Sequence, residues 1–375
     1  VIGITVALIT VLNPFYAQDS YITDYLYTRM TGISSDIIIV GVDEETLSAY
    51  GNFNKWSREK TAELMEYFAS DKENLPLVLG VDIMFTDALD DSVDERLIEA
   101  ARGLDYVVMA GNLVYRGAME QDGKGNLVYN SQHISAVEMP FEGLNQVTIG
   151  AFSNACIASD GCVRYAMNDA IYNNSLTNEI EKYDSFAYSI YKIYAEKKGI
   201  NLSVPSTNRA GQFQFFYSGE SKEFSHVSLA DVLDGKIPAN AFKNKIVLLG
   251  AYAPGFQDAY QTAADRGSSM YGVEIHANII QAYIQQKTAN SPTNLALLII
   301  TTAVVGLFIF LTWRQKLSVA LAETVAAFVI TIFAGKLAAS KGIVFPLIYL
   351  LLTFIIVAIY HIVEKYVFER LRRMK

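Results

Sequence analysis

Cysteine is scarce in this sequence, which limits the covalent and metal chemistry open to the fold. The 375 residues include 2 cysteines, Cys156 and Cys162. A zinc site is disfavoured because no second pair of ligands is spaced near them. The two residues form either a disulfide, which would stabilise the fold little because the loop that it closes is short, or two buried thiols.

The short motifs of common enzymes are absent as well. The sequence has no Walker loop, no Gly-x-Ser-x-Gly elbow and no His-Glu-x-x-His motif, and its isolated glycines form no phosphate-binding fingerprint. Asp87, Asp90, Asp91 and Asp94 lack the glycine and the terminal glutamate of an EF-hand loop. We therefore expect no catalytic residue, no metal and no cofactor in this chain, and an extracytoplasmic hydrolase is disfavoured.

Positive charge is scarce in the middle of the chain. Residues 17–291 hold 36 acidic and 21 basic side chains, a net charge of −15, whereas the remainder holds 3 and 9, a net charge of +6. An acidic segment of this kind repels nucleic acid and anionic lipid at long range. Neither is expected as its ligand.

Long apolar runs, in contrast, are abundant at the C-terminal end. Three of them follow one another with short polar joints, at residues 295–313, 317–335 and 343–363. Each approaches the ~20 residues that cross a bilayer as a helix, and Glu323, the only acid inside them, is expected to face a neighbouring helix. A shorter run, Val1 to Leu12, lacks the charged start and cleavage pattern of a signal peptide. We interpret it as the remainder of a first transmembrane helix.

Short-loop lysines and arginines predict the orientation of these four crossings. Arg314 and Lys316 lie between the second and third helices, and five more basic residues follow the fourth, whereas the opposite joint holds Lys336 and Lys341. The sequence therefore predicts a multi-pass protein of the cell membrane with both ends in the cytoplasm. The expected parts are residues 1–16 (remainder of the first helix), 17–291 (extracytoplasmic domain), 292–364 (three transmembrane helices) and 365–375 (start of a cytoplasmic signalling helix).

The extracytoplasmic segment alternates between strand and helix patterns. Short β-branched runs at 36–43, 77–83, 106–110 and 245–250 have the composition of strands in a sheet covered on both faces. Amphipathic helices are expected at 57–70, with Ser57 as N-cap, and at 94–102, 185–198 and 273–286. Such alternation is typical of parallel βαβ units. The fold class is thus an α/β domain, with a mainly parallel sheet and helices on both faces, joined to a helical transmembrane bundle.

Several short segments, taken in order, resemble a known family. They are Val42-Asp43 with Trp56 and Arg58, Gly80 to Phe85, Asp160 to Arg164, Lys245 to Gly250 followed by Asp258, and Tyr271 to Asn278. With one apolar helix before and three after, the chain resembles the CHASE-type extracellular sensory domains of the second class, found in bacterial transmembrane receptors. One departure is that the family's Trp-Pro-Trp-Pro-Arg-like turn reads Phe-Asn-Lys-Trp-Ser-Arg at 53–58.

Seven residues are candidates for a ligand site. Asp43 and Asp82 end two strands that the pattern places side by side, and ligands of open α/β sheets bind at the carboxyl ends of the strands. Arg58, Arg164 and His276 are candidate partners for the two carboxylates. Alternatively, Asp43 and Asp82 cap the turns that follow them and pair with arginines, and their role is purely structural. The remaining candidates are Trp56, which is either a packed side chain or a binding platform, and Asp258, which the resemblance brings in.

The resemblance implies a sensory and membrane portion of a receptor that relays an extracytoplasmic signal to a cytoplasmic output domain. An adenylate or guanylate cyclase is the favoured output, because the basic run 369–373 is similar to the lead-in of that type; a histidine kinase or a serine/threonine kinase is the other possibility. The expected partners are a second copy of the chain in a homodimer, membrane lipid, and a small molecule or envelope protein as ligand. The alternative is a non-enzymatic envelope or assembly protein anchored in the membrane.

Overall fold

The computed structural model describes residues 2–27, 32–89, 91–121, 127–130, 133–174, 177, 179–208, 210–264, 267–313, 315–364 and 366. The chain forms two compact units. The first combines both ends of the sequence, Val1–Arg29 and Ala289–Lys375, and the second is Met30–Thr288. The second unit is therefore an insertion into the first along the sequence. We refer to them as the helical unit and the α/β unit.

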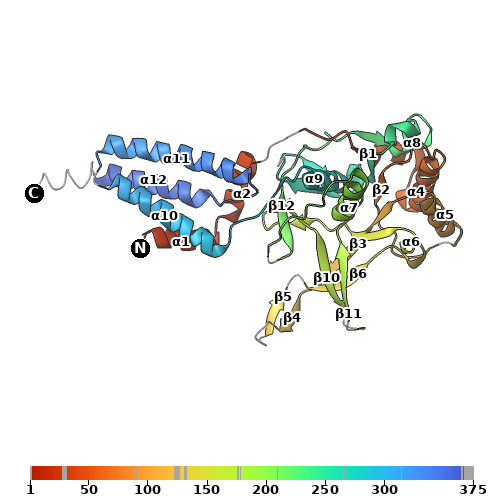
Figure 1. The fold of residues 1–375 in the computed structure, drawn as a ribbon, viewed down its shortest axis with the longest axis horizontal. Coiled ribbons are helices and arrows are strands. Elements are labelled where there is room, and N and C mark those ends of the chain that lie inside the picture. The colour runs from red at the N-terminus through yellow and green to blue at the C-terminus, as the bar shows by residue number, and fades with distance from the viewer. Residues whose placement is uncertain are drawn as a thin grey trace, which may run out of the picture. The chain divides into compact units, whose positions relative to one another are not determined.

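A seven-stranded, mainly parallel sheet forms the centre of the α/β unit (Figure 1). Its order is β13 (His226–Ser228), β1 (Ile37–Val42), β14 (Ile246–Ala251), β2 (Val78–Asp82), β3 (Val107–Tyr115) and β6 (Ile134–Glu138), with β7 (Ile149–Phe152) parallel to β3 and β6 antiparallel to it. The three central strands β1, β14 and β2 are almost entirely buried apolar runs. Such strands need helices on both faces of the sheet, and the predicted α/β class is confirmed.

The position of β14 corrects one expectation from the sequence. Ile39 pairs with Leu248, and Leu248 pairs with Gly80, so β14 lies between β1 and β2. The prediction that the strands ending at Asp43 and Asp82 are neighbours is therefore wrong. The reason is topological: a strand from far along the chain completes the middle of the sheet.

Helices cover the two faces of this sheet with separate hydrophobic cores. Ile37 and Ile39 of β1 belong to a core with α7 (Phe186–Lys198) and α9 (Gly272–Ile284), whereas Val40 and Val42 belong to a core with α4, α5 and α8. Figure 1 shows these two helix layers on opposite sides of β1 and β2. The second layer consists of α4 (Phe53–Ala69), α5 (Asp91–Arg102) and α8 (Leu229–Leu233), with α3 (Glu44–Tyr50) and α6 (Glu142–Asn145) beside them.

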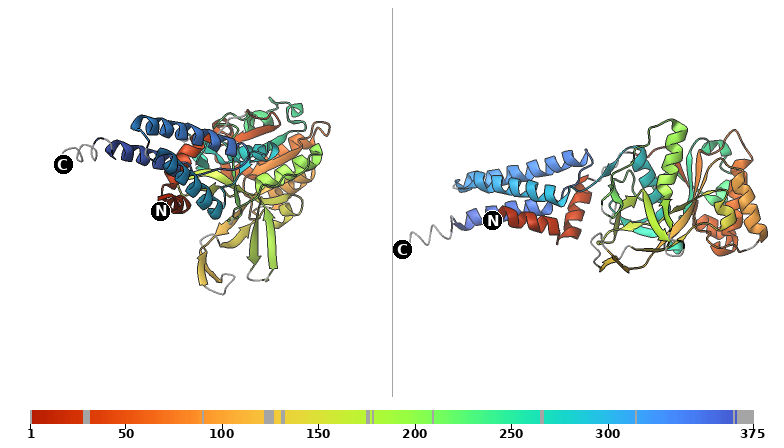
Figure 2. Two further views of the ribbon diagram at one scale, coloured as in Figure 1. Left: turned by 60° about the vertical axis from the view of Figure 1, so that its left-hand side comes forward. Right: turned by 60° about the horizontal axis from the view of Figure 1, so that its bottom comes forward.

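A second, six-stranded sheet and two hairpins were not predicted. The sheet has the order β16 (Ser269–Tyr271), β15 (Ala259–Thr262), β9 (Cys162–Met167), β12 (Gln212–Phe215) and β17 (Thr288–Ala289), with β8 (Cys156–Ile157) paired to β9. The hairpins are β4 (Ala118–Gln121) with β5 (Leu127–Asn130), and β10 (Asp169–Asn174) with β11 (Glu179–Asp184). Both extend away from the central sheet (Figure 1 and the left view of Figure 2).

Helix α4 begins earlier than its sequence pattern indicated. Its N-cap is Asn52, whose side chain accepts a hydrogen bond from the backbone N–H of Asn54 at 3.1 Å, and the expected cap, Ser57, lies inside the helix. The prediction of Ser57 as N-cap is wrong because an asparagine one turn earlier satisfies the first free N–H groups of the helix. The earlier start adds the turn that carries Trp56.

The helical unit contains α1 (Ile2–Leu12), α2 (Tyr16–Tyr27), α10 (Asn294–Thr312), α11 (Leu317–Ala339) and α12 (Ile348–Val363). By length and composition, α10 and α11 are able to cross a membrane, and α1 and α12 are shorter apolar helices. Figure 2 shows α10, α11 and α12 running alongside one another. In α11, the half-buried Glu323 has one carboxylate oxygen without a hydrogen-bond partner among the described residues.

Polar side chains join the two ends of the sequence within this unit. The Tyr349 hydroxyl donates a hydrogen bond to the Asn13 side chain at 2.7 Å and accepts one from the backbone N–H of Phe15 at 2.8 Å. Asp19 on α2 accepts a hydrogen bond from the backbone N–H of Ile348 at 2.9 Å, at the start of α12. These bonds explain why α2 belongs to the helical unit.

Candidate functional site

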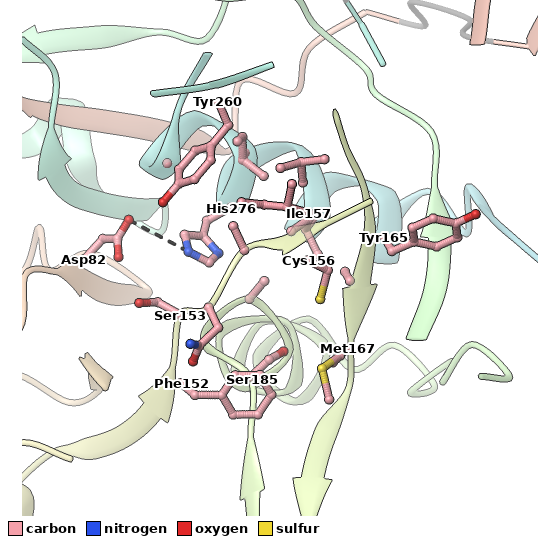
Figure 3. Close-up of a pocket in the computed structure, with 18 of the residues that line it drawn as sticks. Asp82, Phe152, Ser153, Cys156, Ile157, Tyr165, Met167, Ser185, Tyr260 and His276 are labelled. Carbon is pink, nitrogen blue, oxygen red and sulfur yellow. Dashed lines mark ion pairs between the residues drawn. The ribbon is translucent and has the colours of Figure 1, made fainter. Parts of the chain in front are cut away.

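A cavity of about 420 Å³ lies at the carboxyl ends of β2 and β7, between the central sheet and the second sheet (Figure 3). Asp82 ends β2, and Ser153 follows β7. Helix α9 contributes His276, and β15 contributes Tyr260. The carboxyl ends of the strands are where open α/β sheets bind their ligands, and the volume is within the range of small-molecule sites.

Asp82 is the most perturbed acid in this cavity. Its side chain is 10% exposed, and a carboxylate oxygen lies 3.8 Å from Nε2 of His276. Burial raises the pKa of Asp82 to about 7, although a hydrogen bond from Ser153 opposes the shift. The cause is desolvation, because a buried carboxylate loses its hydration and gains no protein cation in return.

Asp258 is the second acid of the cavity. Burial raises the pKa of its carboxyl, the charge of Asp82 raises it further, and a hydrogen bond from the Tyr260 hydroxyl opposes both effects. Gly272, the first residue of α9, allows this position: a Cβ there would lie 2.5 and 2.8 Å from the two carboxylate oxygens of Asp258. The two acids therefore face the same cavity and repel each other.

His276 stands beside these acids and is neutral. Burial lowers its pKa to about 4, against the attraction of Asp258 and a hydrogen bond with the backbone of Ser153. The ring is 8% exposed and packs at its edge against Phe186, with ring centroids 5.0 Å apart. Its Nδ1 atom is buried and has no hydrogen-bond partner among the described residues. An unpaired buried polar atom is costly and therefore requires an explanation.

The lining of the cavity has an unusual charge composition. It includes Asp82, Asp258 and His276, and it has no lysine or arginine among the described residues. Most of the other lining side chains are apolar, among them Phe152, Ile275 and Ile279. No group of three His, Cys, Asp or Glu side chains in the described part of the chain is placed to hold a metal ion. The site is thus a mixed apolar and acidic pocket.

Three of the sequence-derived candidates lie in other settings. Asp43 is the N-cap of α3, and its carboxylate accepts hydrogen bonds from the backbone of Thr46 at 2.9 Å and from the Ser228 hydroxyl at 2.8 Å. Trp56 is 6% exposed and donates a hydrogen bond to the Gly51 carbonyl at 3.1 Å. Arg164 is 2% exposed and makes two hydrogen bonds to Asp160, at 2.7 and 2.8 Å.

Arg58 forms a separate buried ion pair with Asp94. Its guanidinium also donates to the Asp87 carbonyl and lies 5.4 Å from the ring centre of Phe85. This arrangement joins α4 to α5. Of the seven candidates, the structure therefore brings together Asp82, Asp258 and His276, and it places Asp43, Trp56, Arg58 and Arg164 elsewhere.

The two cysteines are free thiols; Cys162 is buried, whereas Cys156 is only half-buried, so the alternative of two buried thiols holds for Cys162 alone. Cys156 lines the cavity, and burial raises its pKa to about 12. Such a thiol is a poor nucleophile because the reactive species is the thiolate. The described residues therefore have the features of a binding site and not those of a site for thiol catalysis.

Sequence reasoning missed Ser153 and Tyr260. Ser153 directly follows β7. The rule that identified Asp82, that ligands bind at the carboxyl ends of strands, therefore also pointed to Ser153. Tyr260 lies on β15, a four-residue strand whose mixed polar sequence has no clear pattern. It is two residues from Asp258 in sequence, and its role appears only in the hydrogen bond that its hydroxyl donates to that acid in the folded chain.

The sequence matches the model of the CHASE2 domain over residues 1–313. No curated protein and no solved structure matches the chain. The family match spans the whole α/β unit and continues through α10. CHASE2 domains are extracellular sensory domains of signalling receptors. Because the match covers far more than half of its 375 residues, the chain belongs to the CHASE2 domain family.

Proposed function

We propose that this chain is the sensory and membrane portion of a bacterial signal-transducing receptor, and that the cavity at Asp82 and His276 is its ligand site. One observation carries the proposal: a sensory-family domain contains a cavity of about 420 Å³, lined by His276, whose buried Nδ1 atom has no partner among the described residues. A ligand that occupies the cavity pairs with this atom. The favoured output is an adenylate or guanylate cyclase, with a histidine or serine/threonine kinase as the other possibility.

The proposed topology has four crossings, by α1, α10, α11 and α12, with the α/β unit outside the cell and both ends in the cytoplasm. Two observations support it. Helices α10 and α11 are long and apolar enough to span a bilayer. The joint between them carries Arg314 and Lys316, which favour the cytoplasmic side.

We further propose that the receptor works as a parallel homodimer. Cyclase outputs form their active sites between two chains, and a signal requires a two-state element that the ligand biases. Small residues on α11, such as Ala322 and Ala326, are exposed and permit close helix contact. A strictly monomeric receptor in nanodiscs, with its output domain present, would contradict this proposal.

Cysteine labelling in intact cells tests the topology. In a protein whose native cysteines are replaced, Thr207→Cys places a thiol on an exposed loop of the α/β unit, and Gln315→Cys places one in the joint between α10 and α11. We expect a membrane-impermeant maleimide to label the first in intact cells and the second only after permeabilisation. The reverse pattern would overturn the proposed orientation.

A signalling assay tests the receptor function itself. Residues 1–375 joined to an adenylate cyclase catalytic domain should place cyclic AMP synthesis under the control of the cavity. Ala155→Phe, which fills part of the cavity, is expected to change the cyclase activity of membranes, and Ala241→Phe, on an exposed 3₁₀ turn, is the matched control. Equal activity in both variants and the unmodified protein would favour the envelope-protein alternative.

A further inference from the structure

We propose that the cavity recognises a small organic cation, a protonated amine or amidine with an apolar body, whose charged group lies between Asp82 and Asp258 and donates a hydrogen bond to Nδ1 of His276. This inference rests on the proposed role of the cavity as the sensory site. It adds the chemical class of the ligand, which neither the family nor the fold defines.

The first argument is charge. Asp82 and Asp258 line the same cavity, and the described lining has no lysine or arginine to compensate them. Buried carboxylates are stable when they are paired with a cation or held neutral. The protein itself holds Asp82 neutral up to about pH 7 and leaves room beside it. A cation from outside supplies the missing partner, whereas an anion would be repelled by both acids.

The second argument is hydrogen bonding. Burial lowers the pKa of His276, so the ring is neutral, and its Nδ1 atom has no partner among the described residues. Nε2 faces the Asp82 carboxylate at 3.8 Å, so we assign the ring proton to Nε2, which leaves Nδ1 as an acceptor. Both carboxylates and the His276 ring then supply acceptors in the lining of the cavity. The complementary ligand is rich in N–H donors, as ammonium and amidinium groups are.

The third argument is the shape and polarity of the remaining wall. Phe152, Ile157, Ile275 and Ile279 also line the cavity (Figure 3 shows Ile157 and Phe152). An apolar wall of this size accommodates a hydrocarbon or aromatic body. A bare metal ion leaves that wall uncovered, and no group of three ligand side chains is placed for one in the described part of the chain.

Binding measurements on the full chain in phosphatidylcholine nanodiscs test the inference, with empty nanodiscs as blank. The cationic probes are 2-phenylethylamine, benzamidine and agmatine, and the matched uncharged and anionic probes are 2-phenylethanol and 3-phenylpropanoate. We expect calorimetric binding of at least one cation at pH 8 and none of the other two probes. Zn²⁺ and Ca²⁺, added alone, are expected not to bind.

Isosteric variants locate the site. Asp82→Asn and Asp258→Asn should each lower the affinity for the cation by roughly 30-fold or more, because each removes one carboxylate from a desolvated charge pair. Asp105→Asn, an exposed acid of the same unit, should leave the affinity unchanged. Thermal melts without ligand check folding, and both cavity variants are expected to melt no lower than the unmodified protein at pH 8, because each removes an uncompensated charge.

The outcomes distinguish this inference from the proposed function. Binding of no cation, equal binding of 2-phenylethanol, or unchanged affinity in both aspartate variants would overturn the ligand class. If Ala155→Phe still changes cyclase output in that case, the receptor function stands without the amine. If a cation binds through both aspartates but neither it nor Ala155→Phe alters the output, the site stands and the receptor function fails.

Discussion

The side-chain oxygen of Gln281 accepts a hydrogen bond from the backbone N–H of Ser34 at 3.0 Å. The amide nitrogen of the same side chain donates to the Gly32 carbonyl at 2.8 Å. Gln281 is fully buried on α9, the last helix of the α/β unit, whereas residues 32 and 34 lie in the segment by which the chain enters that unit. One side chain therefore holds the two ends of the α/β unit together.

Replacing Gln281 with leucine should destabilise the α/β unit more than its loss of volume explains. The change leaves the backbone N–H of the half-buried Ser34 without its partner, at up to about 1–3 kcal/mol, whereas the carbonyl of the exposed Gly32 bonds to water instead. Urea unfolding followed by Trp56 fluorescence, in a Trp313→Phe background, measures the effect. Gln261→Leu, at an exposed position, is the control and should change the free energy of unfolding by less than about 0.5 kcal/mol.

The buried pair Arg58–Asp94 and the more exposed pair Arg96–Glu66 should differ strongly in their effect on stability. Arg58→Gln strands the buried carboxylate of Asp94 and should cost about 3–5 kcal/mol. Arg96→Gln breaks a 2.7 Å pair whose two side chains are 39% and 44% exposed, and should cost about 1 kcal/mol or less. Similar losses in both variants would contradict the distinction between the two settings.

Asp82 should make the stability of the α/β unit depend on pH. Its pKa is raised from 3.8 to about 7, so between these values the folded protein keeps a proton that the unfolded chain loses. The free energy of unfolding should therefore fall by up to about 4 kcal/mol as the pH rises from about 4 to about 7. Asp82→Asn removes this contribution.

The comparison of the two proteins isolates Asp82, because His276 titrates in both. The pKa of His276 is lowered to about 4, so its own contribution has the opposite sign and is lost as the pH falls from about 6.5 to about 4. The free energy of unfolding of Asp82→Asn, relative to that of the unmodified protein, should rise between about pH 4 and about pH 7 and level off above pH 7. A difference that does not vary with pH would show that Asp82 is solvated.

Gly272→Ala should disturb Asp258 directly. The added Cβ would lie 2.5 Å from one carboxylate oxygen, so the acid has to move, at about 1–3 kcal/mol for overpacking. Asp258→Ala removes the clash, and the double variant should be less destabilised than the sum of the single changes. Gly255→Ala, where a Cβ would meet nothing within 4 Å, is the control. Additive effects would show that the two residues do not touch.

Local sequence pattern predicted the central elements well because their chemistry is local. The buried runs of β1 and β14 and the capped helix α7 lie within a residue or two of their expected bounds. The order of the strands was not predictable in the same way, since β14 reaches the middle of the sheet from about 200 residues beyond β1. The second sheet was missed because strands as short as β8, with 2 residues, have no periodicity to detect.

The same limit applies to the site. Asp43 and Asp82 share a sequence context, an acid at or just beyond the end of a buried strand, and Arg58 lies near the start of an amphipathic helix; their roles differ because their partners differ. Asp43 caps a helix, Arg58 pairs with Asp94, and Asp82 meets His276 from 194 positions later in the chain. Ligand binding by any of them remains a prediction.

Because the α/β unit is inserted between Arg29 and Ala289, its two ends connect to one and the same helical unit. A translation of the whole α/β unit moves both connections equally and leaves their separation unchanged. Only a change in the spacing or twist between the two connections reaches the helices as a distinct input. In the proposed receptor, a ligand signal therefore reaches the helices as a change in the relation between the two connections.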